Sequence, residues 1–223
     1  MAIQVTHYSD VLCVWAYVAQ IRVTELERNF ADDVAFDFRY FSVFGDVPGK
    51  LARQWSERGG HLGYADHVAE VAARFPHATL HPDTWRACVP RSSMPAHLLL
   101  CAARAFERDG GAAACGELRR LDSAIRTAFF ADGRDVSRRD VLLDVAAGHG
   151  CDAAALAARL DDGTAHALLA DDALAAADQH VRASPTLVFN EGRQMLTGNV
   201  GYRVLEANVR ELLHHPSGQQ SWC

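Results

Sequence analysis

The chain has no apolar run that approaches about 20 residues, the length that a membrane-spanning helix needs, so we expect no membrane span. Lysine is nearly absent, since Lys50 is the only one, and a formal net charge of -6 provides no basic field for nucleic acid or an anionic membrane. The first residues lack a basic segment followed by an apolar stretch, so they predict no secretory signal. We therefore expect a cytoplasmic protein that binds neither nucleic acid nor membranes.

The spacing that is typical of a metal-binding cysteine cluster is also missing. His77 and His81 lack a matching cysteine or carboxylate pair, and we expect neither a metal nor a bound cofactor. In a reducing compartment, most of the six cysteines are expected to be free thiols. They stand at positions 13, 88, 101, 115, 151 and 223.

Hydrophobic periodicity gives an order of elements. Alternating apolar residues predict strands at 3–8 and 34–41, and an apolar stripe at helical spacing predicts a helix from 14 to about 29 between them. From Lys50 to about His180 the pattern is helical only, and Ser93 is the predicted N-cap of one of these helices. A hairpin over 186–197 and a helix over about 202–214 follow.

Cys13 lies where the first strand ends and the long helix begins. The unpaired N–H groups and the dipole of a helix N-terminus favour a thiolate, so this position predicts an exposed, reactive cysteine with a lowered pKa. The alternative is a core residue, because an unpaired cysteine often behaves as a small buried hydrophobe.

Two stretches of the chain can be compared with a known family. Residues 10–17, D-V-L-C-V-W-A-Y, resemble the D-x-x-C-P-W-C-Y stretch of the DsbA-like thioredoxin superfamily, in particular of its cytoplasmic FrnE-like oxidoreductases. Residues 184–189, S-P-T-L-V-F, resemble the V-P-T-F-V-F stretch of that family, and residues 196–199 resemble its L-S-G-A turn.

This resemblance extends to about His214 and implies an α/β thioredoxin fold with a large all-helical insertion, as in DsbA-like proteins. The implied thioredoxin domain is discontinuous, over 1–48 and 164–216, with the insertion at 49–163 and a mobile tail at 217–223. The resemblance also implies a nucleophilic Cys13 and a cis peptide bond before Pro185. The substrate-binding residues that it implies are Val14, Trp15, Ser184 and Pro185, and His7 and Asp10 are candidates to tune the thiol.

The chain departs from the family where dithiol members carry a second cysteine, because Ala16 stands there. Cys13 therefore cannot form a disulfide within the motif. A low-molecular-weight thiol such as glutathione is the natural cosubstrate to release it, and Cys223 or Cys88 is the alternative as a resolving cysteine.

Three functions stay open. The first is a thiol-disulfide oxidoreductase that uses one cysteine and forms mixed disulfides with a small thiol or with protein thiols. The second is a glutathione-dependent transferase or isomerase, similar to the kappa-class transferases and the 2-hydroxychromene-2-carboxylate isomerases, which carry serine in place of Cys13. The third is a thioredoxin-like binding module without catalysis. A homodimer is the assembly that we consider.

Overall fold

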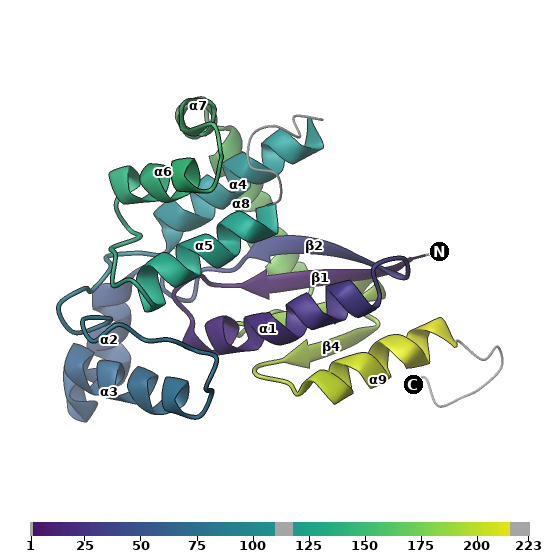
Figure 1. Ribbon diagram of the computed structural model, residues 1–223, viewed down its shortest axis with the longest axis horizontal. Coiled ribbons are helices and arrows are strands. Elements are labelled where there is room, and N and C mark those ends of the chain that lie inside the picture. The colour runs from purple at the N-terminus through teal and green to yellow at the C-terminus, as the bar shows by residue number, and fades with distance from the viewer. Residues whose placement is uncertain (1, 110–117, 215–223) are drawn as a thin grey trace.

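The computed structural model describes residues 2–109 and 118–214, and within them one four-stranded sheet has the order β2-β1-β3-β4 (Figure 1). β1 (Ile3–Ser9) and β2 (Val34–Tyr40) are parallel. β3 (Thr186–Phe189) runs antiparallel to β1 and forms a hairpin with β4 (Gln194–Thr197). The four strands therefore agree with those that the sequence predicts.

Helices cover both faces of this sheet. α1 (Val14–Asn29) connects β1 to β2 and packs with α9 (Tyr202–Leu213) on the face that carries Ile3 and Val5 (Figure 1). α8 (Thr164–Asp178) packs on the opposite face, against Tyr8 and Val188. The alternation of side chains along β1 thus supplies an apolar residue to each face.

Between β2 and α8 the described residues contain helices and loops but no strand, as the sequence predicts, apart from an isolated bridge between Thr84 and Cys88. The short 3-10 turns are η1 (Ser56–Arg58) and, in the hairpin, η2 (Asn190–Gly192). No helix in the described ranges is both long and apolar enough to cross a membrane. The α-helices of this segment are α2 (Val47–Trp55), α3 (Gly60–Ala73), α4 (Met94–Arg108), α5 (Leu118–Phe130), α6 (Arg139–Gly148) and α7 (Ala153–Asp161).

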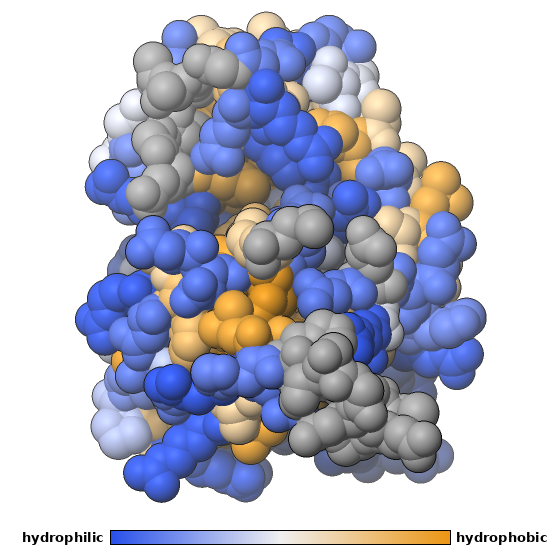
Figure 2. Space-filling model, turned by 90° about the vertical axis from the view of Figure 1, so that its right-hand side faces the viewer, coloured by the Kyte–Doolittle hydropathy of each residue, from blue (hydrophilic) through white to orange (hydrophobic). Residues whose placement is uncertain are grey.

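The carboxyl end of β1 meets this helical segment. Val11 and Leu12, directly after β1, belong to the same hydrophobic cluster as Leu99 of α4 and Phe129 of α5. The amino end of β1 lies at the opposite end of the molecule, which faces the viewer in Figure 2 and is mostly hydrophilic with a hydrophobic patch near its centre. The chain around Cys13 is therefore buried between the sheet and the helical segment.

The predicted cap of α4 differs in detail. Ser93 occupies the N-cap position, but its side chain makes no capping hydrogen bond. Its hydroxyl donates instead to Oδ2 of Asp10 at 2.8 Å. The Ser93 hydroxyl therefore makes a tertiary contact with Asp10 in place of a local capping bond. Periodicity along the sequence cannot predict such a contact.

Arg126 joins α5 to the end of β1. Its side chain is almost fully buried and forms a two-point ion pair with Asp122, with Nε and Nη2 at 3.1 and 3.2 Å from the two carboxylate oxygens. Nη1 also donates to the carbonyl of Asp10 at 3.0 Å, and Nη2 donates to Oγ of Ser9 at 2.8 Å. One guanidinium thus holds helix and strand together.

Replacement of this arginine should strongly destabilise the fold. Arg126→Leu leaves the Asp122 carboxylate buried without its partner, so we expect a loss of about 3–5 kcal/mol in the free energy of unfolding, measured by urea denaturation. The control is Arg138→Ala, which removes an exposed ion pair with Asp140 and should leave the urea midpoint unchanged. Equal midpoints for wild type and Arg126→Leu would contradict this role of Arg126.

Candidate active site

Residues 10–13 form a turn, hereafter the 10–13 turn, in which every backbone N–H group has an acceptor. Three different parts of the chain provide these acceptors, so the turn is fixed by tertiary contacts as well as by its own sequence. The bonds run from Asp10 N–H to Ser184 Oγ (2.9 Å), from Val11 N–H to His97 Nε2 (3.2 Å), from Leu12 N–H to Asp10 Oδ1 (2.8 Å) and from Cys13 N–H to the Asp10 carbonyl (3.1 Å).

The side chain of Asp10 lies inside this turn and is fully buried. Oδ1 accepts the Leu12 N–H, and Oδ2 accepts both the Phe44 N–H at 2.8 Å and the Ser93 hydroxyl. Three donors therefore compensate for the removal of the carboxylate from water. Asp10 lies in the same turn as Cys13, and its negative charge opposes ionisation of the thiol.

Cys13 is the N-cap residue of α1, as expected. Its Sγ donates to the carbonyl oxygen of Ser184 at 3.2 Å, so the thiol contacts the loop that precedes β3. Two segments that lie far apart in the sequence thus meet at one sulfur atom.

The expected exposure and lowered pKa of Cys13 differ from what the structure gives. The residue is only 6% exposed, and burial raises the pKa of its thiol. The Ser184 side chain and the N–H groups of Ala16 and Trp15 act in the opposite direction by hydrogen bonding to the sulfur, but burial is the larger effect. Sequence position alone gave the wrong sign because it contains no measure of burial.

Three residues follow the thiol in the first turn of α1. Ala16 and Val14 are both buried, and Trp15 is only partly buried. Of the two predicted substrate-binding residues in α1, Trp15 is therefore the one that keeps part of its surface accessible. Ala16 packs in the core at the position of the second cysteine of dithiol relatives.

The opposite side of the site is the 184–185 loop. The peptide bond between Ser184 and Pro185 is cis. Both polar groups of Ser184 are used, since its carbonyl accepts the Cys13 thiol and its hydroxyl accepts the Asp10 N–H. A valine at this position could not supply the second bond, so the serine fixes the loop against the 10–13 turn.

His7 was a candidate to tune the thiol, and the structure places it beside α1, in a small cavity that Val23 and Leu187 also line. Its Nδ1 is buried and, among the described residues, has no hydrogen-bond partner. Its ring lies edge-on to Phe38 with centroids 5.5 Å apart. Burial, with a smaller contribution from the Arg126 charge, lowers the pKa of His7 to about 3. His7 is therefore neutral at ordinary pH.

The remaining cysteines occupy other environments. Cys88 is half-buried, and burial together with Asp135 and Asp83 raises its pKa to about 11. Cys13, Cys88 and Cys101 are free thiols, in line with the expectation that most of the cysteines are free, and Cys151 is disulfide-bonded. Cys223, the other candidate resolving cysteine, lies outside the described residues.

Sequence reasoning missed several groups that complete the site. Ser93 is the N-cap residue of α4, His97 lies in α4 and Arg126 lies in α5. Each of them contacts the 10–13 turn. Lys50 in α2 places Nζ 4.8 Å from the centre of the Phe44 ring, and Phe44 donates its N–H to Asp10. That Lys50 is the only lysine was the one signal that could have drawn attention to it.

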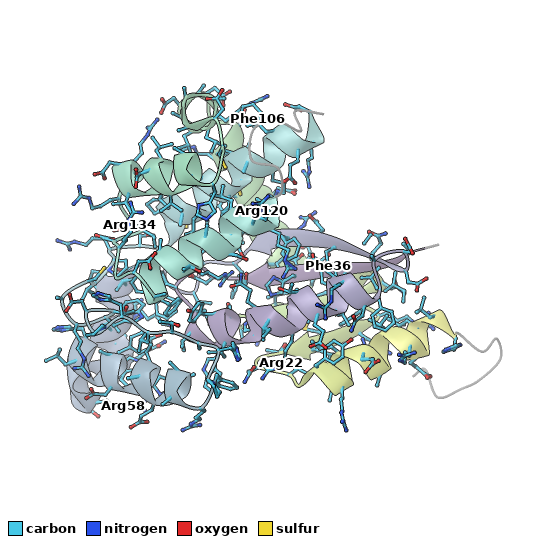
Figure 3. The ribbon with its side chains drawn as sticks, in the orientation of Figure 1. Arg22, Phe36, Arg58, Phe106, Arg120 and Arg134 are labelled. Atoms are coloured by element: carbon cyan, nitrogen blue, oxygen red, sulfur yellow. The ribbon has the colours of Figure 1, made fainter. Side chains whose placement is uncertain are left out.

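A cleft lies in another part of the molecule, away from the 10–13 turn. Phe36, Arg120 and Arg134, which are labelled in Figure 3, line a cleft of about 1440 Å³ between β2 and the helices α4, α5 and α6. Its lining residues carry charges of both signs and do not come from the 10–13 turn. The buried thiol and this cleft are therefore separate features.

The sheet order, the helical segment and a helix N-terminal cysteine opposite a proline loop define a thioredoxin-type protein with a DsbA-like insertion. The family model of the DSBA-like thioredoxin domain matches residues 4–210, so the chain belongs to this family. No curated protein matches the chain.

Solved structures support the same fold. A probable DsbA oxidoreductase from Streptomyces coelicolor is 24% identical with a TM-score of 0.72, covering 98% of this chain and 93% of the other. The cytosolic disulfide reductase DsbM from Pseudomonas aeruginosa is 18% identical with a TM-score of 0.67, covering 93% and 98%. A 2-hydroxychromene-2-carboxylate isomerase is 15% identical with a TM-score of 0.63, covering 94% and 96%.

The burial of Cys13 predicts slow alkylation. With iodoacetamide at pH 7, Cys13 should react more slowly than in an unfolded peptide that spans residues 9–17, because its raised pKa leaves little thiolate. The rate, mapped to Cys13 by mass spectrometry, should keep rising beyond pH 9. In denaturant the two rates should become equal, and a plateau below pH 8 in the folded protein would contradict the raised pKa.

The neutral His7 makes stability depend on pH. Between the ordinary pKa near 6.5 and about 3, the unfolded chain binds a proton that the folded chain does not, so stability falls as pH falls. From pH 7.5 to pH 5, we expect wild type to lose about 2 kcal/mol more than His7→Leu, measured by urea unfolding of both at each pH. Identical losses would show that His7 does not titrate in this way.

Proposed function

We propose that the protein is a thiol-disulfide oxidoreductase that acts through Cys13 alone and forms a mixed disulfide with a low-molecular-weight thiol such as glutathione. The observation that carries this proposal is the contact of 3.2 Å between Cys13 Sγ and the Ser184 carbonyl, at the N-terminus of α1. It brings one thiol, the N–H groups that favour its thiolate and the backbone of the buried proline loop to a single place. A substrate disulfide that pairs with this loop would present its sulfur to Cys13.

The exchange is a displacement at sulfur. The Cys13 thiol loses its proton to solvent, and the thiolate attacks one sulfur of the substrate disulfide. A bond between Cys13 and that sulfur forms, the original sulfur-sulfur bond breaks, and the other half leaves as a thiolate. A second small thiol then attacks the mixed disulfide, which releases Cys13 and yields a new disulfide.

Ala16 explains why we propose an external thiol for release. A dithiol protein resolves the mixed disulfide with its own second cysteine, but Ala16 has no sulfur and lies buried beside Cys13. Cys88 is set among Asp83 and Asp135, whose charges oppose its ionisation, so it is the weaker candidate for this role. We further propose that the protein acts in the cytosol, and the similarity of fold to DsbM, a cytosolic disulfide reductase, supports this.

A glutathione-dependent isomerase is the second candidate. The raised pKa of Cys13 favours it, because an enzyme that activates the sulfur of bound glutathione needs no nucleophile of its own at this position. The similarity of fold to a 2-hydroxychromene-2-carboxylate isomerase supports the same alternative. In that case Cys13 would donate a hydrogen bond to the glutathione sulfur rather than attack a disulfide.

The two candidates differ in whether a covalent adduct forms. Incubated with glutathione disulfide at pH 8.5, wild type should gain one glutathionyl group, mapped to Cys13 by mass spectrometry, and Cys13→Ser should gain none there. Reduced glutathione should then remove the adduct and restore the thiol. Reversible glutathione binding without an adduct would favour the isomerase, and no response to either compound would leave a binding module.

Ala16→Cys provides a matched control. The new thiol would lie at the N-terminus of α1, three residues after Cys13, where it can attack the mixed disulfide. This variant should therefore end as an internal disulfide that has lost two hydrogens, without a stable adduct. If Ala16→Cys retains the glutathionyl group as wild type does, Cys13 is not positioned for exchange with its neighbour in α1.

A further inference from the structure

His97 belongs to α4, is completely buried and contacts the 10–13 turn. Its Nε2 is 3.2 Å from the Val11 nitrogen, its Nδ1 is 3.0 Å from Oγ of Ser42, and its ring stacks on Tyr40 with centroids 5.4 Å apart. The imidazole therefore connects the turn that carries Cys13 to the segment that follows β2.

The hydrogen bonds on either side of the ring determine its tautomer. A backbone N–H can only donate, so Nε2 must accept from Val11 and must carry no proton. At the other end, the Ser42 hydroxyl donates to the sulfur of Met94 at 2.9 Å, which leaves its oxygen free to accept from Nδ1–H. Both ends thus select the neutral ring with its proton on Nδ1.

We infer that His97 is a positioning residue for Cys13, which acts by accepting the Val11 N–H and thereby holding the 10–13 turn in register with the Ser184 carbonyl. The role rests on the proposed function, because it concerns the geometry of the same thiol. The other three N–H groups of the turn donate to acceptors of their own, so the Val11 N–H is the one that depends on His97.

Asp10 makes the protonation state of His97 important. Its Oδ1 is 3.7 Å from Nε2, close enough to attract a proton on that nitrogen. A protonated Nε2 would face the Val11 N–H donor to donor, so the turn would lose its acceptor. Burial holds the pKa of His97 below its ordinary value, with Arg126 acting in the same direction and Asp10 and Asp122 against it.

Two amide substitutions separate the two ring nitrogens. In His97→Gln the side-chain oxygen reaches the position of Nε2 and can accept the Val11 N–H, whereas in His97→Asn the shorter side chain reaches only the position of Nδ1. If His97 positions the turn through Nε2, Gln should preserve the properties of Cys13 and Asn should not. Both variants remove the titratable ring, so charge alone cannot distinguish them.

The measurement is iodoacetamide labelling, resolved by cysteine with mass spectrometry. In His97→Asn the unpaired Val11 N–H should loosen the turn and raise the labelling rate of Cys13 by about tenfold, whereas His97→Gln should stay within about twofold of wild type. Cys101, one turn further along α4 and fully buried, is the internal control and should label at the wild-type rate in both variants.

Several results would overturn the inference. Equal Cys13 rates in the Asn and Gln variants would mean that the acceptor at Nε2 is unimportant, and parallel rises at Cys13 and Cys101 would mean that α4 itself had opened. If His97→Asn does not fold, Ser42→Ala supplies the test, because loss of the Nδ1 partner frees the other tautomer and should speed Cys13 labelling several-fold. Labelling needs no disulfide exchange, so its outcome is independent of whether the proposed function holds.

Discussion

The rest of the site depends on one constraint, which is that a turn buried between sheet and helices must satisfy each of its backbone N–H groups. The 10–13 turn does so with acceptors from the 184–185 loop, from α4 and from Asp10 itself. Arg126 adds a donor for the Asp10 carbonyl. The helical segment between β2 and α8 is therefore part of the active-site scaffold as well as a cover over the sheet.

The same burial that makes the turn rigid also sets the chemistry of Cys13. Withdrawal from water disfavours the thiolate more than the N-terminus of α1 favours it, and the buried Asp10 charge adds to the effect. Lys50, which lies over the Phe44 ring, is one cation that interacts favourably with both Asp10 and Cys13. The Cys13 thiol is thus held mainly in its protonated form at neutral pH.

The family relationship constrains the fold more than the activity. The match to the DSBA-like thioredoxin domain covers residues 4–210, while the solved structures of similar fold include both a disulfide reductase and an isomerase. A shared fold therefore does not by itself decide between these activities. Ala16, Ser184 and His97 are the residues around the 10–13 turn at which this chain can differ from other members of the family.

Local periodicity was enough to locate the strands, the long helix α1 and the terminal hairpin, because alternation and helical spacing are properties of neighbouring residues. It also placed Cys13 at the start of a helix, whereas its position beside the Ser184-Pro185 loop was implied by the family resemblance. It could not show that Ser93 would bind Asp10 instead of capping α4, nor that His97 and Arg126 would converge on the 10–13 turn. Those contacts join residues more than 80 positions apart, and the pKa of Cys13 follows from the burial they create, so only the tertiary structure decided them.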